Sequence, residues 1–595
     1  MGTRTARDLR HKLDDIDRRG YPAYKDLRGV YAFAGFDLAI DHVQGDPFAA
    51  PSGLACCLSN AQAGWPRELF DTPWRRVAFE DFLVRRFCRA AARWSHKVGG
   101  SGKSGLLATS RPGPEVLERS ACVVGSKGLE LRFEAGFPAH GRTVDAGALA
   151  RMLFDFVPRI VDEALVCHER DLDQARAVAD LADDQHFMRG ELDRLGLVAF
   201  VADGSVLPRE SGVSARPMRG ALAFESPQSM RVTLELPHHG PTPGMGIRRG
   251  VTLVVGGGYH GKSTLLQALQ EGVYDHVAGD GREYVACDAG AMKLRAEDRR
   301  AVHGVDISLF IDNLPNGADT RAFSTAGASG STSQAASTCE ALEAGCRTLL
   351  IDEDTSATNF MVRDSLMAAV VSAEHEPITP FVERVRGLWE QQGVSSVIVV
   401  GSSGAFFGVA DAVLQMDSYR CLDITQRVRE ICGCCKERKA AAVAPLVQPG
   451  EKTRLLDLSA ASSQAPGTSA GCEDVDASSG ATRVKGHGGR GGKADRVKVR
   501  SSRDSIQVGN GSVDLRLVEQ LADSEQAAAL AQMVRLATER GLLAGGCTVG
   551  EVCRVVFDEL GEVGLDALDP HGTPGCGLAM PRLQEFAAAL NRWRP

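Results

Sequence analysis

The chain has 595 residues, 44% of them hydrophobic and 24% charged, and a formal net charge of −8. These values are typical of a soluble globular protein with about three domains, and they exclude a chain coated with basic residues, although a local basic patch can still bind nucleic acid. The 16 cysteines follow no disulfide-like spacing, which indicates a reducing compartment. No window approaches about 18 uncharged apolar residues, so we expect no transmembrane helix and no membrane partner.

Residues 1–180 mix short strand-like and helical patterns, which predicts an N-terminal α+β domain with a candidate nucleic-acid surface. The strand-like run LELRFEAGF (129–137) and the helical GALARMLFDFVPRIVDEAL both lie in it. Its first 20 residues already include four aspartates, and such acidity is not typical of a transit peptide.

A basic face is predicted on the helix FLVRRFCRAAARW (82–94). Its arginines recur at every fourth residue, and Phe82, Phe87 and Trp94 lie near them. The next segment, GGSGKSG, lacks the first glycine of a P-loop and a preceding strand, so it is interpreted as an exposed loop. The two interpretations left open are a surface that tracks nucleic-acid phosphates and a solvated basic face. The candidate contacts are Arg85, Arg89, Arg93 and Lys103.

Apolar runs alternate with helical stretches over residues 181–435. The runs are VTLVV (251–255), TLLID (348–352) and SSVIVVG (395–401). Such alternation predicts an α/β domain, a mostly parallel sheet covered by helices.

The stretch GGGYHGKST follows VTLVV and opens a helix, and it fits the P-loop pattern G-x-x-x-x-G-K-[ST]. Its glycines let backbone N–H groups turn toward phosphates, and the lysine reaches the β- and γ-phosphate oxygens. The serine hydroxyl suits Mg²⁺. The pattern predicts a P-loop NTPase site for ATP or ADP with Mg²⁺. Its residues are Gly256, Gly257, Gly258, Tyr259, His260, Gly261, Lys262, Ser263 and Thr264.

A small-residue turn, ASGSTSQAA (328–336), opens another helix. It resembles the signature motif of ABC-type ATPases, L-S-G-G-x-x-Q, with Ser329, Gly330, Ser331 and Gln334 in the matching places. In that superfamily the signature of one subunit closes over the γ-phosphate held by its partner. The resemblance therefore implies that these four residues bind nucleotide across a dimer.

The strand-like TLLID ends in Asp352 and is followed by Glu353, which is a Walker B pattern. Asp352 is predicted to hold Mg²⁺ together with Ser263, and Glu353 to act as the general base that polarises the attacking water. DTSATN (354–359) resembles the family's D-loop.

Two departures from the ABC pattern stand out. No switch histidine follows SSVIVV, where Ser402 or Ser403 is present instead, and we predict a catalytic role for Ser402. No Q-loop glutamine precedes the signature, and Glu297, Asp306 and Ser308 are the candidates for its place. These departures argue against transporter-type coupling and for slow turnover.

Residues 436–495 are rich in Ala, Ser, Gly and Pro, which predicts a flexible low-complexity insert. Residues 496–595 regain helical periodicity and predict a small, mainly helical C-terminal domain. The basic run 483–503 overlaps both, and Lys498 and Arg500 are its candidate RNA contacts.

The combination GGGYHGKSTLL, KLRAEDRR, DISLFIDNLP, ASGSTSQAA and LIDEDTSATNFMVRD is similar to the family of predicted ABC-class ATPases. The resemblance covers almost the whole chain outside 436–495, and it is closest to mitochondrial members that bind RNA and are accessory to RNA editing. It implies an ATP-hydrolysing homodimer that binds RNA, with RNA-editing or processing complexes as partners and a mitochondrial location. A cytoplasmic location is the alternative.

One P-loop and one signature occur in the chain, so a complete site needs two copies. The alternative function is a nucleotide-gated clamp or scaffold that acts on DNA or protein with little hydrolysis. A transporter motor ranks third, and a P-loop kinase would leave the signature without a purpose.

Overall fold

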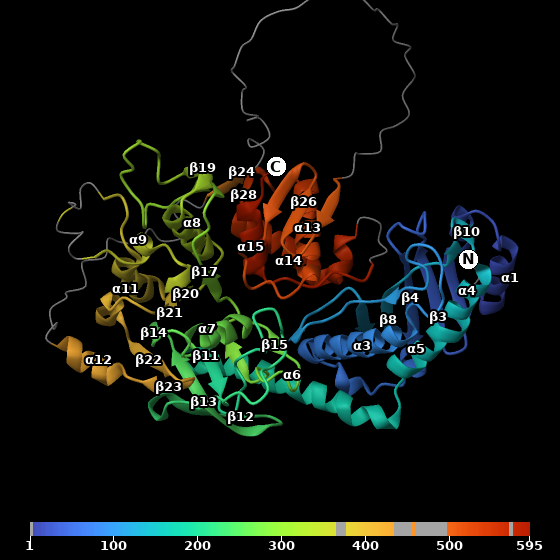
Figure 1. Ribbon diagram of the computed structural model, residues 1–595, viewed down its shortest axis with the longest axis horizontal. Coiled ribbons are helices and arrows are strands. Elements are labelled where there is room, and N and C mark those ends of the chain that lie inside the picture. Colours follow the sequence, from blue (N-terminus) through green and yellow to red (C-terminus); the bar gives the residue numbers. More distant parts are fainter. Residues whose placement is uncertain are drawn as a thin grey trace, which may run out of the picture.

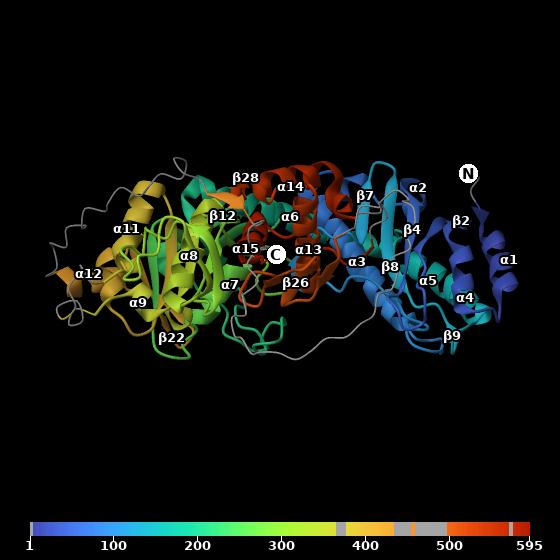
Figure 2. The ribbon, with the colours of Figure 1, turned by 90° about the horizontal axis from the view of Figure 1, so that it is seen from above.

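Three parts make up the molecule in the computed structural model, which describes residues 4–364, 370, 376–433, 454–457, 497–569 and 575–594. The N-terminal part and the P-loop part lie at opposite ends of an elongated shape, and the C-terminal part lies between them (Figures 1 and 2). Helix α6 (Glu169–Leu195) runs from the first part to the second. The predicted boundary at residue 180 therefore falls inside one continuous helix.

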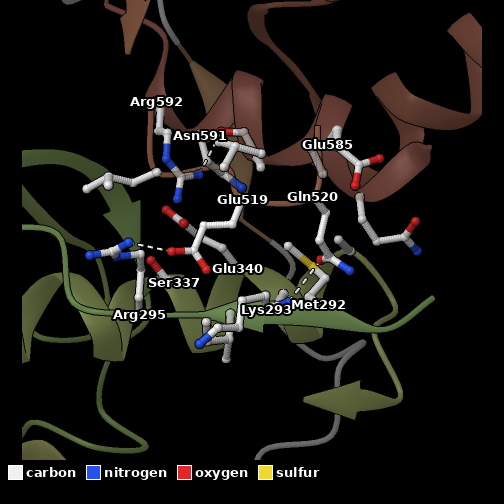
Figure 3. Close-up of a pocket in the computed structure, with 18 of the residues that line it drawn as sticks. Met292, Lys293, Arg295, Ser337, Glu340, Glu519, Gln520, Glu585, Asn591 and Arg592 are labelled. Atoms are coloured by element: carbon white, nitrogen blue, oxygen red, sulfur yellow. Dashed lines mark hydrogen bonds and ion pairs between the residues drawn. The ribbon is translucent and has the colours of Figure 1, made fainter. Parts of the chain in front are cut away.

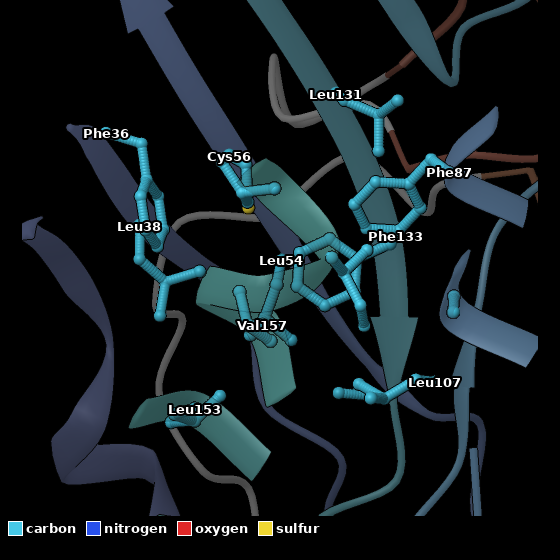
Figure 4. Packing of buried hydrophobic residues seen from close by; sticks show 14 of the residues in the cluster. Phe36, Leu38, Leu54, Cys56, Phe87, Leu107, Leu131, Phe133, Leu153 and Val157 are labelled. Atoms are coloured by element: carbon cyan, nitrogen blue, oxygen red, sulfur yellow. The ribbon is translucent and has the colours of Figure 1, made fainter. Parts of the chain in front are cut away.

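The N-terminal part is built on a seven-stranded sheet in the order β1-β2-β3-β4-β8-β5, with β7 also paired to β8. Apolar residues alternate along β4, so that Leu54, Cys56 and Leu58 are buried. They pack with Phe133 of β8 and Val157 of a covering helix (Figure 4). The strands are β1 (Arg4–Thr5), β2 (Gly29–Phe33), β3 (Phe36–His42), β4 (Ser52–Ser59), β5 (Leu107–Ala108), β6 (Glu115–Val116), β7 (Cys122–Gly125), β8 (Gly128–Ala135), β9 (Ala139–His140) and β10 (Thr143–Val144), and the helices before α6 are α1 (Ala6–Ile16), α2 (Asn60–Ala63), α3 (Pro73–Trp94), α4 (Ala146–Arg151) and α5 (Val157–Ala164).

The P-loop part contains a six-stranded sheet in the order β17-β20-β21-β14-β22-β23. Its first five strands are parallel, and β23 is antiparallel to β22, which confirms the predicted mostly parallel α/β sheet. The three predicted runs form β14, β20 and β21 at its centre. The strands are β14 (Val251–Val255), β17 (Met292–Leu294), β20 (Thr348–Asp352), β21 (Ser395–Val400), β22 (Ala412–Asp417) and β23 (Arg420–Asp423).

A second, antiparallel sheet in the order β12-β13-β11-β16 packs against the first across helix α7. Residues of α7, such as Leu265 and Leu269, are fully buried in the cluster between the two sheets, and α8 and α11 contribute to the cluster on the opposite face. The remaining elements are β11 (Leu197–Ala202), β12 (Arg231–Leu236), β13 (Gly240–Arg248), β15 (Asp275–His276), β16 (Val285–Cys287), β18 (Arg300–Val305) and β19 (Phe323–Ala328), with helices α7 (Lys262–Glu271), α8 (Gly330–Glu343), α9 (Thr358–Met361), α11 (Phe381–Gln392) and α12 (Thr425–Cys432).

The C-terminal part joins three helices to a small three-stranded sheet. Arg119 of the N-terminal part pairs with Asp523 and Glu525, and Arg592 pairs with Glu297 of the P-loop part, so this unit contacts both others. Its elements are β25 (Val499–Ser501), β26 (Ser505–Val508), β27 (Gly511–Asp514), α13 (Ser524–Glu539), β28 (Ala544–Thr548), α14 (Val549–Val563) and α15 (Leu583–Arg592).

The predicted insert 436–495 lies outside the described residues except for 454–457. That stretch contains the short strand β24 (Leu455–Asp457), which pairs with β28 of the C-terminal part. Among the helices that the structure describes, none is long and apolar enough to cross a membrane.

Candidate functional site

The predicted P-loop forms the turn between β14 and α7. Gly256 has φ +144°, and a Cβ there would lie 2.3 Å from the backbone oxygen of Met416 on the neighbouring strand β22. Gly261, with φ +99°, ends the turn directly before the helix. Both positions require glycine because other residues rarely adopt positive φ and the first has no room for a side chain. The loop consequently carries its backbone N–H groups close to the start of α7, where an anion is stabilised.

Lys262 is the first residue of α7, and its side chain turns back into the loop. Its Nζ donates to the carbonyl oxygens of Gly256 and Gly257, both at 2.8 Å, and the residue is only 8% exposed. An ammonium group held inside a loop of glycines is placed to exchange these carbonyls for phosphate oxygens.

The apex of the loop is held from strand β22. Ser418 donates its backbone N–H to Nδ1 of His260 at 2.9 Å, and Asp417 lies 3.2 Å from the same nitrogen. Tyr259 has positive φ and is 99% exposed, so it projects from the apex into solvent. Of the predicted loop residues, His260 therefore shapes the loop, and Tyr259 is free to meet a ligand or a second chain.

Ser263 and Asp352 converge beside the loop. The Ser263 hydroxyl donates to Oδ2 of Asp352 at 3.2 Å, although the two residues belong to α7 and to the end of β20. The two predicted residues are thus in contact, and a hydroxyl and a carboxylate are oxygen ligands that suit Mg²⁺. When bound, Mg²⁺ would neutralise charge on the β- and γ-phosphates.

Glu353 follows at the end of the same strand and is held by the segment after β21. Ser402 donates its hydroxyl to Oε1 at 2.6 Å and its N–H to Oε2 at 3.0 Å, and Gly401 donates a second N–H to Oε2 at 2.6 Å. Partial burial alone would raise the pKa of Glu353, but these hydrogen bonds outweigh it and lower the pKa below its ordinary value. Ser402 thus positions an ionised Glu353.

The signature turn caps helix α8. The Ser329 hydroxyl accepts the N–H of Thr332 at 3.4 Å and lies 3.4 Å from the hydroxyl of Ser331, within the same turn. Ser329 is exposed at the N-terminus of a 14-residue helix, where N–H groups favour an anion. Ser329 is therefore accessible to a second molecule, whereas the predicted contact Ser331 is only 8% exposed.

Gln334 has a different environment from the one predicted for a nucleotide contact. Its side chain is fully buried, its amide nitrogen donates to the Ser356 hydroxyl at 2.9 Å, and its oxygen accepts the N–H of Ala357 at 2.8 Å. Because both ends of the amide are engaged, Gln334 ties the signature helix to the segment DTSATN instead of facing a ligand.

The three candidates for the missing Q-loop residue do not face the Ser263–Asp352 pair. Glu297 is buried in an ion pair with Arg592 of the C-terminal part. Asp306 accepts both the N–H and the hydroxyl of Ser308, at 3.0 and 2.6 Å, so these two residues stabilise their own turn. These expectations were wrong because the position of a residue in the sequence does not reveal whether it lies on β17, the edge strand that pairs with β20 and so runs close to Asp352.

The residue that β17 brings to this place is Lys293, which sequence reasoning missed. Strand β17 pairs in parallel with β20, and Lys293 Nζ donates to the Thr355 hydroxyl at 3.4 Å. Burial lowers the pKa of Lys293, and the negative charges of Glu519 and Asp352 offset only part of this shift. Three residues, MKL, are too short a run to predict a strand, so no signal in the sequence marked this lysine.

The predicted aromatic and basic face of α3 is largely not a free surface. Phe82 and Phe87 are buried in the N-terminal core, and Arg85 pairs with the buried Asp81 at 2.5 Å. Arg93 pairs with Glu163. The predicted basic residues do lie on one helix, but α3 itself supplies the partner of Arg85, and α5 supplies the partner of Arg93. Of the predicted contacts, Arg89 and Lys103 are exposed here, and Arg93 is 59% exposed although it is paired. Lys498, directly before β25, and Arg500 on β25 are exposed as well.

Three family models match almost the whole chain. The model of the ABC-class ATPase N-terminal region matches residues 6–168, the ABC ATPase P-loop domain matches 171–448, and the MRB1590 C-terminal domain matches 496–595. Their consecutive order along one chain confirms the resemblance found from the motifs.

Individual relatives match parts of the chain. The uncharacterized protein MJ1628 of Methanocaldococcus jannaschii is 31% identical over 266 residues, which are 43% of this chain and 57% of that protein. Among solved structures, the ADP conformation of MJ1267, an ATP-binding cassette of an ABC transporter, is 11% identical with a TM-score of 0.23, covering 34% of this chain and 91% of its own. CbiO1 from Clostridium perfringens, part of an ABC transporter complex, is 13% identical with a TM-score of 0.25, covering 40% and 91%.

Proposed function

Because the chain belongs to the family of ABC-class ATPases and is related to MRB1590, we propose that it binds ATP with Mg²⁺ and hydrolyses it to ADP and phosphate. The observation that carries this proposal is the convergence of Lys262, Ser263, Asp352 and Glu353 at the ends of β14 and β20. Lys262 binds phosphate oxygens, and the ionised Glu353 orients and deprotonates the attacking water.

A second copy of the chain completes the site in this proposal. Ser329, the exposed residue of the signature turn, sits at a helix N-terminus and can bind the γ-phosphate held by the partner's P-loop. ATP would then favour the closed pair, and hydrolysis would release it. A two-fold symmetric dimer would contain two such composite sites.

Two substitutions test binding and hydrolysis separately. Glu353→Gln keeps the size of the side chain but removes the base, so ATP should still bind while turnover falls by about 100-fold or more and a dimer accumulates. Lys262→Ala should weaken ATP binding itself. Nucleotide affinity, phosphate release and the mass of the complex in solution are measured for each. Equal turnover in parent and Glu353→Gln would refute the assignment of the base.

The proposal extends to RNA, with the protein acting as an accessory factor in mitochondrial RNA editing or processing. It is supported by the match to the MRB1590 C-terminal domain and by the exposed Arg89, Lys103, Lys498 and Arg500. Contacts from such residues to phosphates give affinity without sequence preference.

A salt titration tests the RNA contacts. The logarithm of the affinity should fall linearly with the logarithm of salt concentration, and each lost phosphate contact should reduce the slope by about one. The double variants Arg89→Ala with Lys103→Ala, and Lys498→Ala with Arg500→Ala, are compared with the exposed Arg176→Ala on α6 as control. Absence of RNA binding at low salt would refute this part of the proposal.

A nucleotide-gated clamp with little hydrolysis is the second candidate. It is favoured by one observation: both carboxylate oxygens of Glu353 are already occupied by Ser402 and Gly401. A base that is bound in this way is a weak acceptor for water. ATP-dependent dimerisation of the parent chain without measurable phosphate release would favour the clamp.

A further inference from the structure

A cavity opens on the metal side of the nucleotide site, between the P-loop part and the C-terminal part. Its volume is about 420 Å³, and Ser263, Asp352, Lys293 and Thr355 line one wall. The opposite wall comes from the C-terminal part, where Arg503 and Arg516 are exposed beside Glu519. The cavity thus extends outward from the oxygen pair that suits Mg²⁺.

Lys293 is fixed on this wall through its backbone. Strand β17 lies at the edge of its sheet, so no strand in the described part of the chain pairs with its outer side. The side chain of Gln520 binds there instead, and its Oε1 accepts the Lys293 N–H at 2.9 Å. The Gln520 amide nitrogen in turn donates to Ala291 and to Gln270 at 3.2 Å. Figure 3 shows Gln520 next to Lys293, and Glu519 next to Arg295. Gln520 thus fixes the backbone of Lys293 without contacting its ammonium group.

The ammonium group of Lys293 is lightly engaged for a half-buried charge. It has three donors, and among the described residues its one hydrogen bond is the 3.4 Å contact to Thr355. Arg295, two residues further along, is by contrast in direct ion contact with Glu519. A desolvated cation with spare donors is stabilised by an anion, and the cavity provides room for one.

The terminal phosphate of ATP is the anion that fits this place. Ser263 and Asp352 would hold Mg²⁺ together with the bound nucleotide, and the ion would neutralise charge on the phosphates, so the terminal phosphate would lie close to this pair. Lys262 approaches the phosphates from inside the loop, whereas Lys293 lies on the cavity wall that Ser263 and Asp352 also line. ADP lacks the group that would reach the second lysine.

We propose that Lys293 is a second phosphate-binding lysine, which contacts the terminal phosphate and makes the site prefer ATP over ADP. This inference rests on the proposed function and adds the residue that distinguishes the two nucleotides.

Equilibrium binding of ATP and of ADP, each with Mg²⁺, tests the inference. Lys293→Met should lower the affinity for ATP about 10- to 100-fold and leave that for ADP within about twofold. Lys293→Arg keeps the charge and should keep most of the preference. Arg295→Met, on the same strand but paired with Glu519, is the matched control and should leave the ratio of the two affinities unchanged.

The outcomes separate this inference from the proposed function. The inference is overturned if Lys293→Met has the same ratio of ATP to ADP affinity as the parent, including the case in which it loses affinity for both nucleotides equally. ATP binding by the parent chain would still support the proposed function in that case. A parent chain that binds neither nucleotide refutes both. If Lys293→Met does not fold, as judged by its thermal transition, Lys293→Gln retains a partner for Thr355 and is measured in its place with the same expected result.

Discussion

The strongest stability prediction concerns Arg119, which connects the N-terminal part to the start of α13. Its side chain is 2% exposed, and its guanidinium pairs with Asp523 at 2.6 Å and with Glu525 at 2.5 Å. Arg119→Met keeps most of the volume but leaves two partly buried carboxylates without their counter-charge. Breaking a buried pair in this way costs about 3–5 kcal/mol.

The pH dependence of this loss follows from Glu525. Burial raises the pKa of Glu525, and the charge of Arg119 opposes that shift, so the substitution raises the pKa further. A carboxyl group whose pKa is higher in the folded than in the unfolded state destabilises the fold as pH rises through the folded value. The deficit should therefore be largest at pH values above the raised pKa of Glu525, where this carboxylate is ionised, and should shrink as the pH falls toward the ordinary range of a glutamate.

Hydrogen exchange of the α13 amides under increasing urea measures the free energy of opening at the site of the change. The matched control is Arg540→Met, because Arg540 is 56% exposed and pairs with Glu559 at 2.7 Å. An exposed pair contributes about 0–1 kcal/mol. A loss for Arg119→Met no larger than that of the control, or a deficit that grows on acidification, would refute the reasoning.

Two further predictions concern the P-loop and the N-terminal core. Gly256→Ala should abolish ATP binding because the new Cβ would meet the Met416 backbone oxygen at 2.3 Å. The control is Gly190→Ala on helix α6, outside the loop, where no atom lies within 4 Å of the new Cβ, and it should bind ATP like the parent in the same titration. Phe133→Ala removes a ring that is 1% exposed and should lower the free energy of unfolding by urea by about 3–5 kcal/mol. The control Val123→Ala, at an exposed position, should lower it by under about 0.5 kcal/mol. Equal unfolding midpoints for the two variants would contradict the packing in Figure 4.

The P-loop and the central strands could be predicted because their signals are local. Glycines at Gly256 and Gly261, the lysine and serine after them, and the apolar run before them belong to one continuous segment. Strands β20 and β21 are five and six consecutive buried residues, which is the pattern of a parallel strand covered on both faces. The pairing of Ser263 with Asp352 then follows from the shared edge of the sheet.

Contacts between residues that lie far apart in the chain could be determined only from the tertiary structure. The amphipathic pattern predicted helix α3, yet only the packing of α3 on the sheet and on α5 determines that Phe87 is core and that Arg93 meets Glu163. Gln334 likewise matches a motif, but its burial against Ser356 changes what the amide contacts.

The sequence by itself determined the P-loop and the acidic pair Asp352–Glu353 at the end of an apolar run, because these patterns consist of particular residues at fixed short spacings. Only the tertiary structure decided that Ser402 holds Glu353 and that a three-residue edge strand carries Lys293 to Thr355. The physical reason is that burial and ion pairing depend on which surfaces meet, and residues of the C-terminal part such as Gln520, more than 200 positions from Lys293, complete those surfaces.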